Sequence, residues 1–161
     1  MLTKEYKVEE ISYKRKEDRR ILEAVLNTWF KNPKLLNLVS PNLKYPFNFK
    51  EWLKIYPRFH TRSLILKENN WIIGHLSIKQ DLKSNNIHLF HLVIDPKHNR
   101  HGYGSKLIHK AEIIGHYLNV KAITLNVLKS NEAAIKLYDK LGYKINDNKS
   151  NQKRICYEKI Y

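Results

Sequence analysis

The chain has 161 residues, of which 42% are hydrophobic and 11% aromatic, and its 30 Lys and Arg against 15 Asp and Glu give a formal net charge of +15. This length and apolar content suffice for one domain with a hydrophobic core, and they exclude two ordinary domains and a disordered polyelectrolyte. The single cysteine, Cys156, excludes an internal disulfide framework and a cysteine-based structural zinc site, as suits a reducing compartment.

Hydropathy and charge bear on location and partners. No apolar run approaches the roughly 20 residues needed to span a bilayer, and the first residues lack the apolar stretch of a secretory signal. We therefore expect a cytoplasmic protein with no membrane partner. The excess positive charge favours anionic ligands such as phosphorylated cofactors, and it leaves nucleic acid open as a less favoured partner. A biased genome explains dispersed lysines equally well.

The N-terminal part of the chain predicts a strand, a helix and an irregular segment. Residues 6–12 are compatible with a short strand, and Asp18 to Phe30 carries apolar side chains at helical spacing. Residues 31–57 hold four prolines with aromatic side chains between them. This pattern predicts short helical turns and loops.

The middle of the chain predicts three neighbouring antiparallel strands. Residues 61–67 and 71–79 are rich in apolar and β-branched side chains and flank Glu68-Asn69-Asn70, as in a hairpin. Residues 87–94 form a third apolar run, and Asp95-Pro96 ends it. These three strands form the expected centre of a sheet.

The C-terminal part alternates helices and strands, and no repeat or linker divides the chain, so we expect one domain over residues 1–161. Asn131 suits a helix start and Gly142 a helix end. The whole order predicts the α/β (α+β) class, with a mixed, largely antiparallel central sheet of about six to seven strands and helices on both faces. The expected elements here are a helix over 103–118, a strand over 122–127, a helix over 132–141, and strands over 143–146 and 154–160.

A glycine-containing loop before a helix is the most informative motif. Gly102-Tyr103-Gly104 links the strand over 87–94 to the helix over 103–118. Glycines let the backbone approach a ligand closely, and the first N–H groups of a helix point outward with the positive end of its dipole. A diphosphate therefore suits this loop. The Walker A spacing is absent, and the motif G-x-G-x-x-G fails because Leu107 stands at the third glycine.

Two segments together resemble one family. Asn99-Arg100-His101-Gly102-Tyr103-Gly104 is similar to the acyl-CoA-binding motif Q/R-x-x-G-x-G/A of the GNAT superfamily of N-acyltransferases, with Asn99 in place of the usual Gln or Arg. The downstream block from Leu125 to Tyr143 also resembles the family, and the resemblance is specific over residues 87–145. It implies a GNAT-like fold along nearly the whole chain, acetyl-CoA as cofactor, CoA as product and no metal.

The resemblance also implies roles for individual residues. Tyr138 is the expected general acid, Asn131 the expected contact to the pantetheine arm, and Arg100 or Lys97 could restore the charge lost at Asn99. Backbone N–H groups around Leu92 and Val93 are expected to meet the oxyanion. The full expected cofactor-binding set is Leu92, Val93, Ile94, Asn99, Arg100, His101, Gly102, Tyr103, Gly104, Ser105, Asn126, Asn131 and Tyr138.

Two histidines compete for the role of general base. The resemblance places the base at His88, and histidine has a suitable unperturbed pKa for proton transfer near neutrality. His91 is the rival, although strand alternation puts it on the opposite face unless a bulge intervenes. Either residue could instead be an ordinary half-buried strand residue. A metal site from the pair is not expected, because three-residue spacing separates them on a regular strand and no carboxylate or cysteine is close in sequence.

The acceptor is expected against residues 31–57, because the first helices of the GNAT fold face the cofactor. Trp29, Tyr45, Trp52 and His91 are the candidate acceptor-binding residues, although core packing is favoured for both tryptophans. Few carboxylates occur in this segment, so a polyamine is not encouraged. We expect a primary amine of a small molecule, an amino acid, a peptide or a protein.

Three functions compete at this point. An acetyl-CoA-dependent N-acetyltransferase, in which the amine attacks directly in a ternary complex, explains both segments. The alternative is a non-catalytic GNAT-like module that binds CoA or nucleic acid without turnover. A nucleic-acid-binding domain ranks last, since the sequence lacks a helix-turn-helix, RNP aromatics and paired Cys and His. The acceptor, the acyl chain length and a homodimer stay open.

Overall fold

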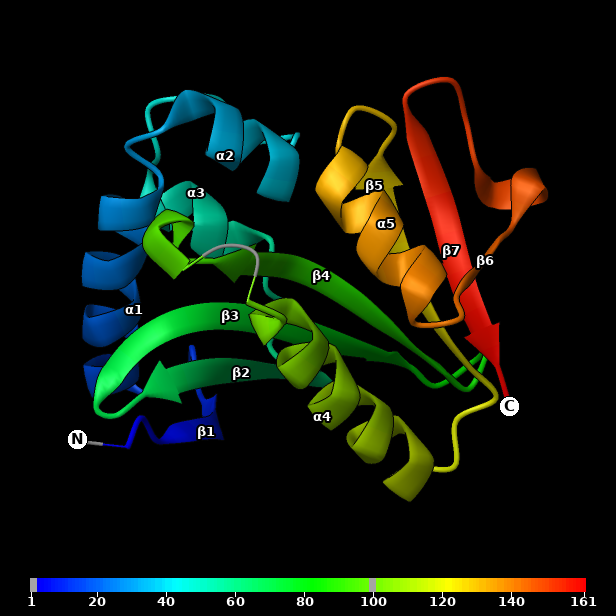
Figure 1. Ribbon diagram of the computed structural model, residues 1–161, viewed down its shortest axis with the longest axis horizontal. Coiled ribbons are helices and arrows are strands. Elements are labelled where there is room, and N and C mark those ends of the chain that lie inside the picture. The colour runs from blue at the N-terminus through cyan, green and yellow to red at the C-terminus, as the bar shows by residue number, and fades with distance from the viewer. Residues whose placement is uncertain (1–2, 99–100) are drawn as a thin grey trace.

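The computed structural model describes residues 3–98 and 101–161, and within them it shows a seven-stranded sheet with helices on both faces (Figure 1). The predicted fold class is thereby confirmed, and two short helices occupy the proline-rich segment. In chain order the elements are β1 (Tyr6–Ile11), α1 (Lys16–Trp29), α2 (Pro33–Val39), α3 (Phe49–Lys54), β2 (Thr61–Glu68), β3 (Trp71–Asp81), β4 (Asn86–Ile94), η1 (Pro96–His98), α4 (Tyr103–Tyr117), β5 (Ala122–Leu128), α5 (Glu132–Lys140), β6 (Lys144–Ile145), η2 (Asp147–Lys149) and β7 (Arg154–Ile160).

The sheet contains one parallel junction, between β4 and β5. The strand order is β1-β2-β3-β4-β5-β7-β6, and every other neighbouring pair is antiparallel. A parallel pair requires a crossover, and α4 provides it. The two strands pair only from Asn86 to Leu89 against Ala122 to Leu125. Beyond these residues β4 and β5 diverge, so a gap opens in the sheet (Figure 1).

Asparagine side chains start three of the helices. The side-chain oxygens of Asn32 and Asn48 each accept two backbone N–H bonds in the first turns of α2 and α3. Asn131 accepts a bond of 3.3 Å from the N–H of Ala134 in α5, as the sequence predicts. Such caps replace hydrogen bonds that the first turn of a helix cannot make for itself. They explain why α2 and α3 form within a proline-rich segment.

Two hydrophobic cores cover the two faces of the sheet. On one face, α4 and α5 pack against the leucines and isoleucines of the central strands, and on the other face α1, α2 and α3 form a second core. Alternation along a strand sends neighbouring side chains to opposite faces. Ile87 and Leu89 join the core under α4, so His88 and Phe90 lie on the face of α1 to α3.

A bulge in β4 changes this alternation. The register runs from His75 opposite Val93 to Ser77 opposite Phe90, so β4 holds one residue more than β3 over this stretch. His91 has a φ of 54° at this point, as one residue of a bulge often departs from strand geometry. The extra residue turns His91 to the same face as His88 and Phe90.

Candidate active site

A small pocket of about 70 Å³ lies in the gap between β4 and β5. Side chains from both faces of the sheet and from α5 surround it, so it connects one face with the other. Its lining is Leu38, Val39, Leu76, Leu89, Phe90, His91, Leu92, Asn126, Val127, Asn131, Ala134 and Tyr138.

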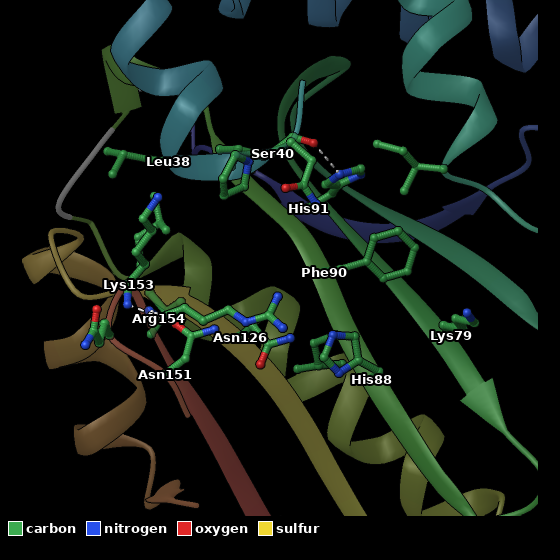
Figure 2. A pocket seen from close by; sticks show the side chains of 18 residues that line it. Leu38, Ser40, Lys79, His88, Phe90, His91, Asn126, Asn151, Lys153 and Arg154 are labelled. Carbon is green, nitrogen blue, oxygen red and sulfur yellow. Dashed lines mark hydrogen bonds between the residues drawn. The ribbon is translucent and has the colours of Figure 1, made fainter. Parts of the chain in front are cut away.

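A second, larger pocket of about 820 Å³ lies on the α1 to α3 face, between the end of α2, β4, β5 and the chain that leads into β7 (Figure 2). The two pockets share seven residues, among them Leu89, His91 and Asn126, and therefore adjoin. The larger one is lined by Leu38, Val39, Ser40, Pro41, Asn42, Ile55, Lys79, His88, Leu89, Phe90, His91, Asn126, Val127, Leu128, Asn151, Gln152, Lys153 and Arg154.

Tyr138 contributes a buried phenol to the small pocket. It lies on the inner face of α5, is 6% exposed, and packs against Tyr143 and Tyr157 with ring centroids 6.0 Å and 5.8 Å away. Burial raises its pKa well above that of a free tyrosine, so the phenol stays protonated at neutral pH. Within the residues that the structure describes, its hydroxyl has no hydrogen-bond partner. It is therefore an available proton donor at the gap.

His88 supplies a neutral imidazole to the large pocket. Its Nδ1 lies 2.8 Å from Thr124 Oγ1 on β5, and no bond in the described part of the chain engages its Nε2. Burial, together with the positive charges of Lys79, Arg154 and Lys149, lowers the pKa of His88 to about 4. The ring is therefore unprotonated at neutral pH, and in the tautomer whose Nδ1–H donates to Thr124 its Nε2 can accept a proton.

His91 reaches the same pocket with both ring nitrogens already engaged. Its Nε2 lies 3.0 Å from Ser40 Oγ and its Nδ1 2.8 Å from Tyr56 Oη, and its ring stacks on Trp52 with centroids 3.8 Å apart. Burial lowers the pKa of His91 well below the usual value, and His75 lowers it further. Of the two candidate bases, His88 is the one with a free nitrogen.

The glycine loop forms the start of α4 beside the gap. Gly102 caps the helix with a φ of 74°, a left-handed conformation that favours glycine. A Cβ on Gly104 would lie 3.1 Å from Leu137 of α5. The first turn of α4 contains no acidic residue, so its N–H groups could hold an anion. Asn99 and Arg100 lie outside the described residues.

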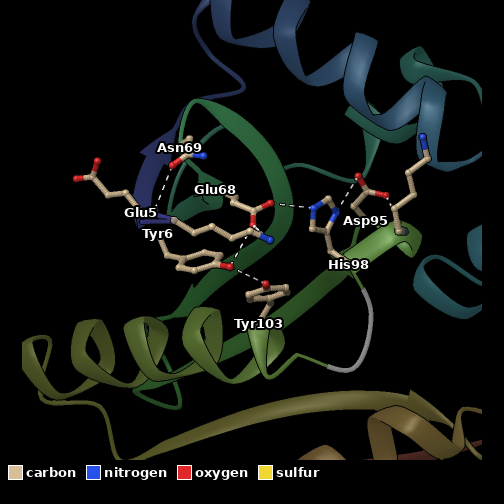
Figure 3. Close-up of polar contacts among 9 residues, drawn as sticks. Glu5, Tyr6, Glu68, Asn69, Asp95, His98 and Tyr103 are labelled. Carbon is tan, nitrogen blue, oxygen red and sulfur yellow. Dashed lines mark hydrogen bonds and ion pairs between the residues drawn. The ribbon is translucent and has the colours of Figure 1, made fainter. Parts of the chain in front are cut away.

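A polar network on the outer side of the loop fixes its position (Figure 3). The His98 ring lies between two carboxylates: its Nε2 is 2.9 Å from Glu68, in hydrogen-bond contact, whereas its Nδ1 lies 3.5 Å from Asp95 and has no hydrogen-bond partner in the described residues. The hydroxyl of Tyr6 donates to Glu68 at 3.1 Å and lies 2.8 Å from that of Tyr103. The network ties the first residue of α4 to β1 and β2. Sequence reasoning missed it because its members are far apart along the chain.

The structure brings only some of the predicted site residues to the pockets. Leu92, Asn126, Asn131, Tyr138, His88 and His91 line them. Val93 is buried under α1 to α3, Ile94 packs beside Gly74, His101 is exposed, and Tyr103 and Ser105 begin α4.

The predicted aromatic acceptor residues are placed elsewhere. Trp29 and Trp52 are buried in the core under α1 to α3, and Tyr45 is 52% exposed with its hydroxyl donating to the carbonyl of Lys31. None of the three lines either of the two pockets described above. The wall of the large pocket comes instead from the end of α2 and from Asn151 to Arg154, which no sequence motif marked.

Clustered metal ligands and long apolar helices are both absent from the described residues. Across residues 3–98 and 101–161, no group of three His, Cys, Asp or Glu side chains is gathered as a metal site would require. None of the helices in these ranges is both long and apolar enough to cross a bilayer.

Comparison with known sequences identifies the protein family to which this chain belongs. The family model described as acetyltransferase (GNAT) family matches residues 28–143. The chain therefore belongs to the GNAT acetyltransferase family, and it is an acyltransferase. No curated protein sequence matches it.

Solved structures share the fold at low sequence identity. The GNAT domain of S. lividans PAT superposes with a TM-score of 0.80 and 13% identity, over 97% of this chain and 90% of that one. Spermidine N-acetyltransferase from Vibrio cholerae, in complex with CoA and spermine, gives 0.75 and 16%, over 96% and 95%. PaiA N-acetyltransferase from Thermoplasma acidophilum, in complex with coenzyme A, gives 0.73 and 18%, over 98% and 99%.

Proposed function

We propose that the chain moves an acetyl group from acetyl-CoA to a primary amine by direct attack, as one domain in the cytoplasm. The observation that carries this proposal is the pair of adjoining pockets, with a free phenol at the gap and a neutral imidazole in the larger pocket. The only cysteine, Cys156, is buried outside both linings, with a pKa that burial raises. This favours direct attack over a cysteine-bound acyl group.

The binding of acetyl-CoA follows from the loop and the gap. We assign its diphosphate to the glycine loop and the first turn of α4, where unpaired N–H groups and the helix dipole favour an anion. Its pantetheine arm would follow the gap past Leu92 and Asn131, whose side-chain oxygen already caps α5 and whose amide group remains to donate. The arm would then bring an activated acetyl group to the edge of the large pocket.

The proposed base and acid lie on opposite faces of the sheet. His88 would take a proton from the incoming ammonium, so that the neutral amine can form a bond to the acetyl carbon. Backbone N–H groups at Leu92 and Val93, beside the bulge, would stabilise the oxyanion. As the carbon–sulfur bond breaks, the Tyr138 hydroxyl would donate its proton to the departing sulfur. The second proton that the nitrogen loses would return to the phenolate, so that amide and thiol both leave neutral and the phenol is restored.

Calorimetric titration with acetyl-CoA, CoA and ATP at two salt concentrations tests the first part. We expect micromolar affinity for acetyl-CoA and CoA and none for ATP. A screen of amines, with release of the CoA thiol as the signal, tests the second part. Cofactor binding without transfer to any amine would contradict the enzymatic proposal and favour a non-catalytic CoA-binding module. Absence of cofactor binding would contradict the proposed site itself.

A further inference from the structure

The charged side chains that line the large pocket are all positive. Lys79 extends from β3, and Lys153 and Arg154 extend from the chain at the start of β7. Together with His88 and His91 these are the titratable residues of the lining, and no Asp or Glu is among its described members. The described lining therefore contains three cationic side chains and no carboxylate that could neutralise them.

The three cations are also not neutralised from outside the lining. None of them forms an ion pair in the part of the chain that the structure describes. Lys79 and Arg154 also lower the pKa of His88, in addition to the larger effect of burial. The three cations therefore line the same pocket as the candidate base.

The local fold directs these cations. The Asn151 side chain accepts bonds of 2.9 Å from the backbone N–H groups of both Lys153 and Arg154, which fixes the turn into β7. Arg154 then pairs with Leu128 across the sheet, and its side chain extends past Asn126 towards His88 (Figure 2). The Arg154 side chain is exposed and forms no hydrogen bond or ion pair in the described residues, so its guanidinium is available to bind a carboxylate or a phosphate through two parallel hydrogen bonds.

Resting on the proposed function, we propose that the acceptor is a small amine that also carries a carboxylate or phosphate group. Arg154, with Lys153 and Lys79, binds the anion, and the amine lies beside His88. The positive charge favours the anion and repels an ammonium group that lacks one. A polyamine such as spermine, present in the Vibrio cholerae structure, brings only positive charge and is disfavoured here.

Matched pairs of amines test this proposal. Acetylation is measured as kcat/KM at pH 8 for leucine against leucinamide, for phosphoethanolamine against ethanolamine, and for spermidine. We expect the anionic member of at least one pair to be preferred by roughly tenfold or more. The first pair reports a carboxylate and the second a phosphate. Leucinamide has the less basic amine, so a preference for leucine cannot arise from a larger share of free amine.

Variants connect the preference to the pocket. Arg154→Met keeps the aliphatic stem and removes the charge, and it should bring the anionic-to-neutral ratio close to one. Lys110→Met, on the exposed side of α4, is the matched control and should leave the ratio unchanged. A ratio near one in the wild-type chain, a preference for spermidine, or an unchanged ratio in Arg154→Met would overturn the proposal.

The outcomes also separate this inference from the function on which it rests. Efficient acetylation of spermidine or of the neutral amines would leave the N-acetyltransferase proposal standing and refute the anionic acceptor. Acetyl-CoA binding without acetylation of any amine in the panel would refute both. Failure to bind acetyl-CoA would refute the proposed cofactor site, and with it both the acetyltransferase proposal and the anionic acceptor.

Discussion

At the residue scale, Tyr138 and Tyr157 form a natural pair for comparison. Both side chains are buried, Tyr138 on the inner face of α5 and Tyr157 on β7. The Tyr157 hydroxyl donates to Asp139 at 3.0 Å, whereas that of Tyr138 faces the gap. Tyr138→Phe should lower kcat by about 100-fold, the usual size of a general-acid contribution, without changing the affinity for acetyl-CoA. Tyr157→Phe should instead lower the free energy of unfolding by about 1 kcal/mol and leave kcat unchanged. Initial rates and urea denaturation distinguish the two, and equal kcat losses would refute the assignment.

The pKa of His88 predicts an unusual pH profile. Since burial and nearby cations hold this pKa at about 4, the ring is neutral throughout the range from pH 5.5 to pH 9. The rate should therefore show no inflection near 6.5 from this residue, and should rise with pH until the acceptor amine is deprotonated.

Substitution of His88 completes this test. His88→Gln should lower kcat by about 100-fold at every pH within the range. His116→Gln, in an exposed position on α4, is the control and should leave the profile intact. A wild-type inflection near 6.5 that disappears in His88→Gln would show that the imidazole titrates in the ordinary range, contrary to its burial.

At the scale of elements, Gly102 precedes α4 and Gly142 follows α5, and both glycines adopt a left-handed backbone conformation. Gly102 has a φ of 74° before α4 and Gly142 a φ of 87° after α5, and a Cβ at either position would meet nothing within 4 Å. Alanine at either should therefore cost about 1 kcal/mol of stability through backbone strain alone. Gly102→Ala should in addition weaken acetyl-CoA binding about tenfold, because it distorts the loop, whereas Gly142→Ala should not. Calorimetric titration of both variants with acetyl-CoA measures this difference. Equal affinities of the two variants for acetyl-CoA would refute the placement of the diphosphate.

The elements also show what could be predicted from sequence. Helical spacing, strand alternation and turn residues are local signals, and the order of elements was therefore predictable. The glycine loop and the helix cap at Asn131 lie in contiguous segments and were predictable for the same reason. The roles of Asn131 and Tyr138 towards the cofactor come from the resemblance to the GNAT family and stay predictions. The wall formed by Asn151 to Arg154 was not, because it reaches the pocket only through the insertion of β7 between β5 and β6. For Trp29 and Trp52 the sequence favours core packing over acceptor binding, and both lie in the core, since large aromatic side chains suit a core as well as a ligand.

At the scale of the whole molecule, buried histidines connect stability to pH. His75 is fully buried, its Nδ1 donates to the carbonyl of His91 at 2.8 Å, and burial lowers its pKa to about 4. Between pH 6.5 and pH 4 the unfolded chain binds a proton there that the folded chain does not. Stability is thus present above pH 6.5 and declines as the pH falls, by about 2 kcal/mol for His75 at pH 4.5.

Urea denaturation at pH 7 and pH 4.5 measures this decline. In His75→Gln the difference between the two free energies of unfolding should shrink by about 2 kcal/mol relative to the wild type. His116→Gln should leave the difference unchanged, since that ring is exposed. The comparison uses differences between pH values, so a general loss of stability in the variant does not affect it. An unaltered difference in His75→Gln would contradict a buried, neutral imidazole.

The short parallel contact between β4 and β5 gives the molecule two entrances. Under the proposed function, the donor enters from the side of α4 and α5 and the acceptor from the side of α1 to α3, and each reaches the gap without passing the other. Neither substrate must therefore depart before its partner arrives, and either can bind first. Initial-rate plots against one substrate, at several fixed concentrations of the other, should give lines that intersect rather than run parallel.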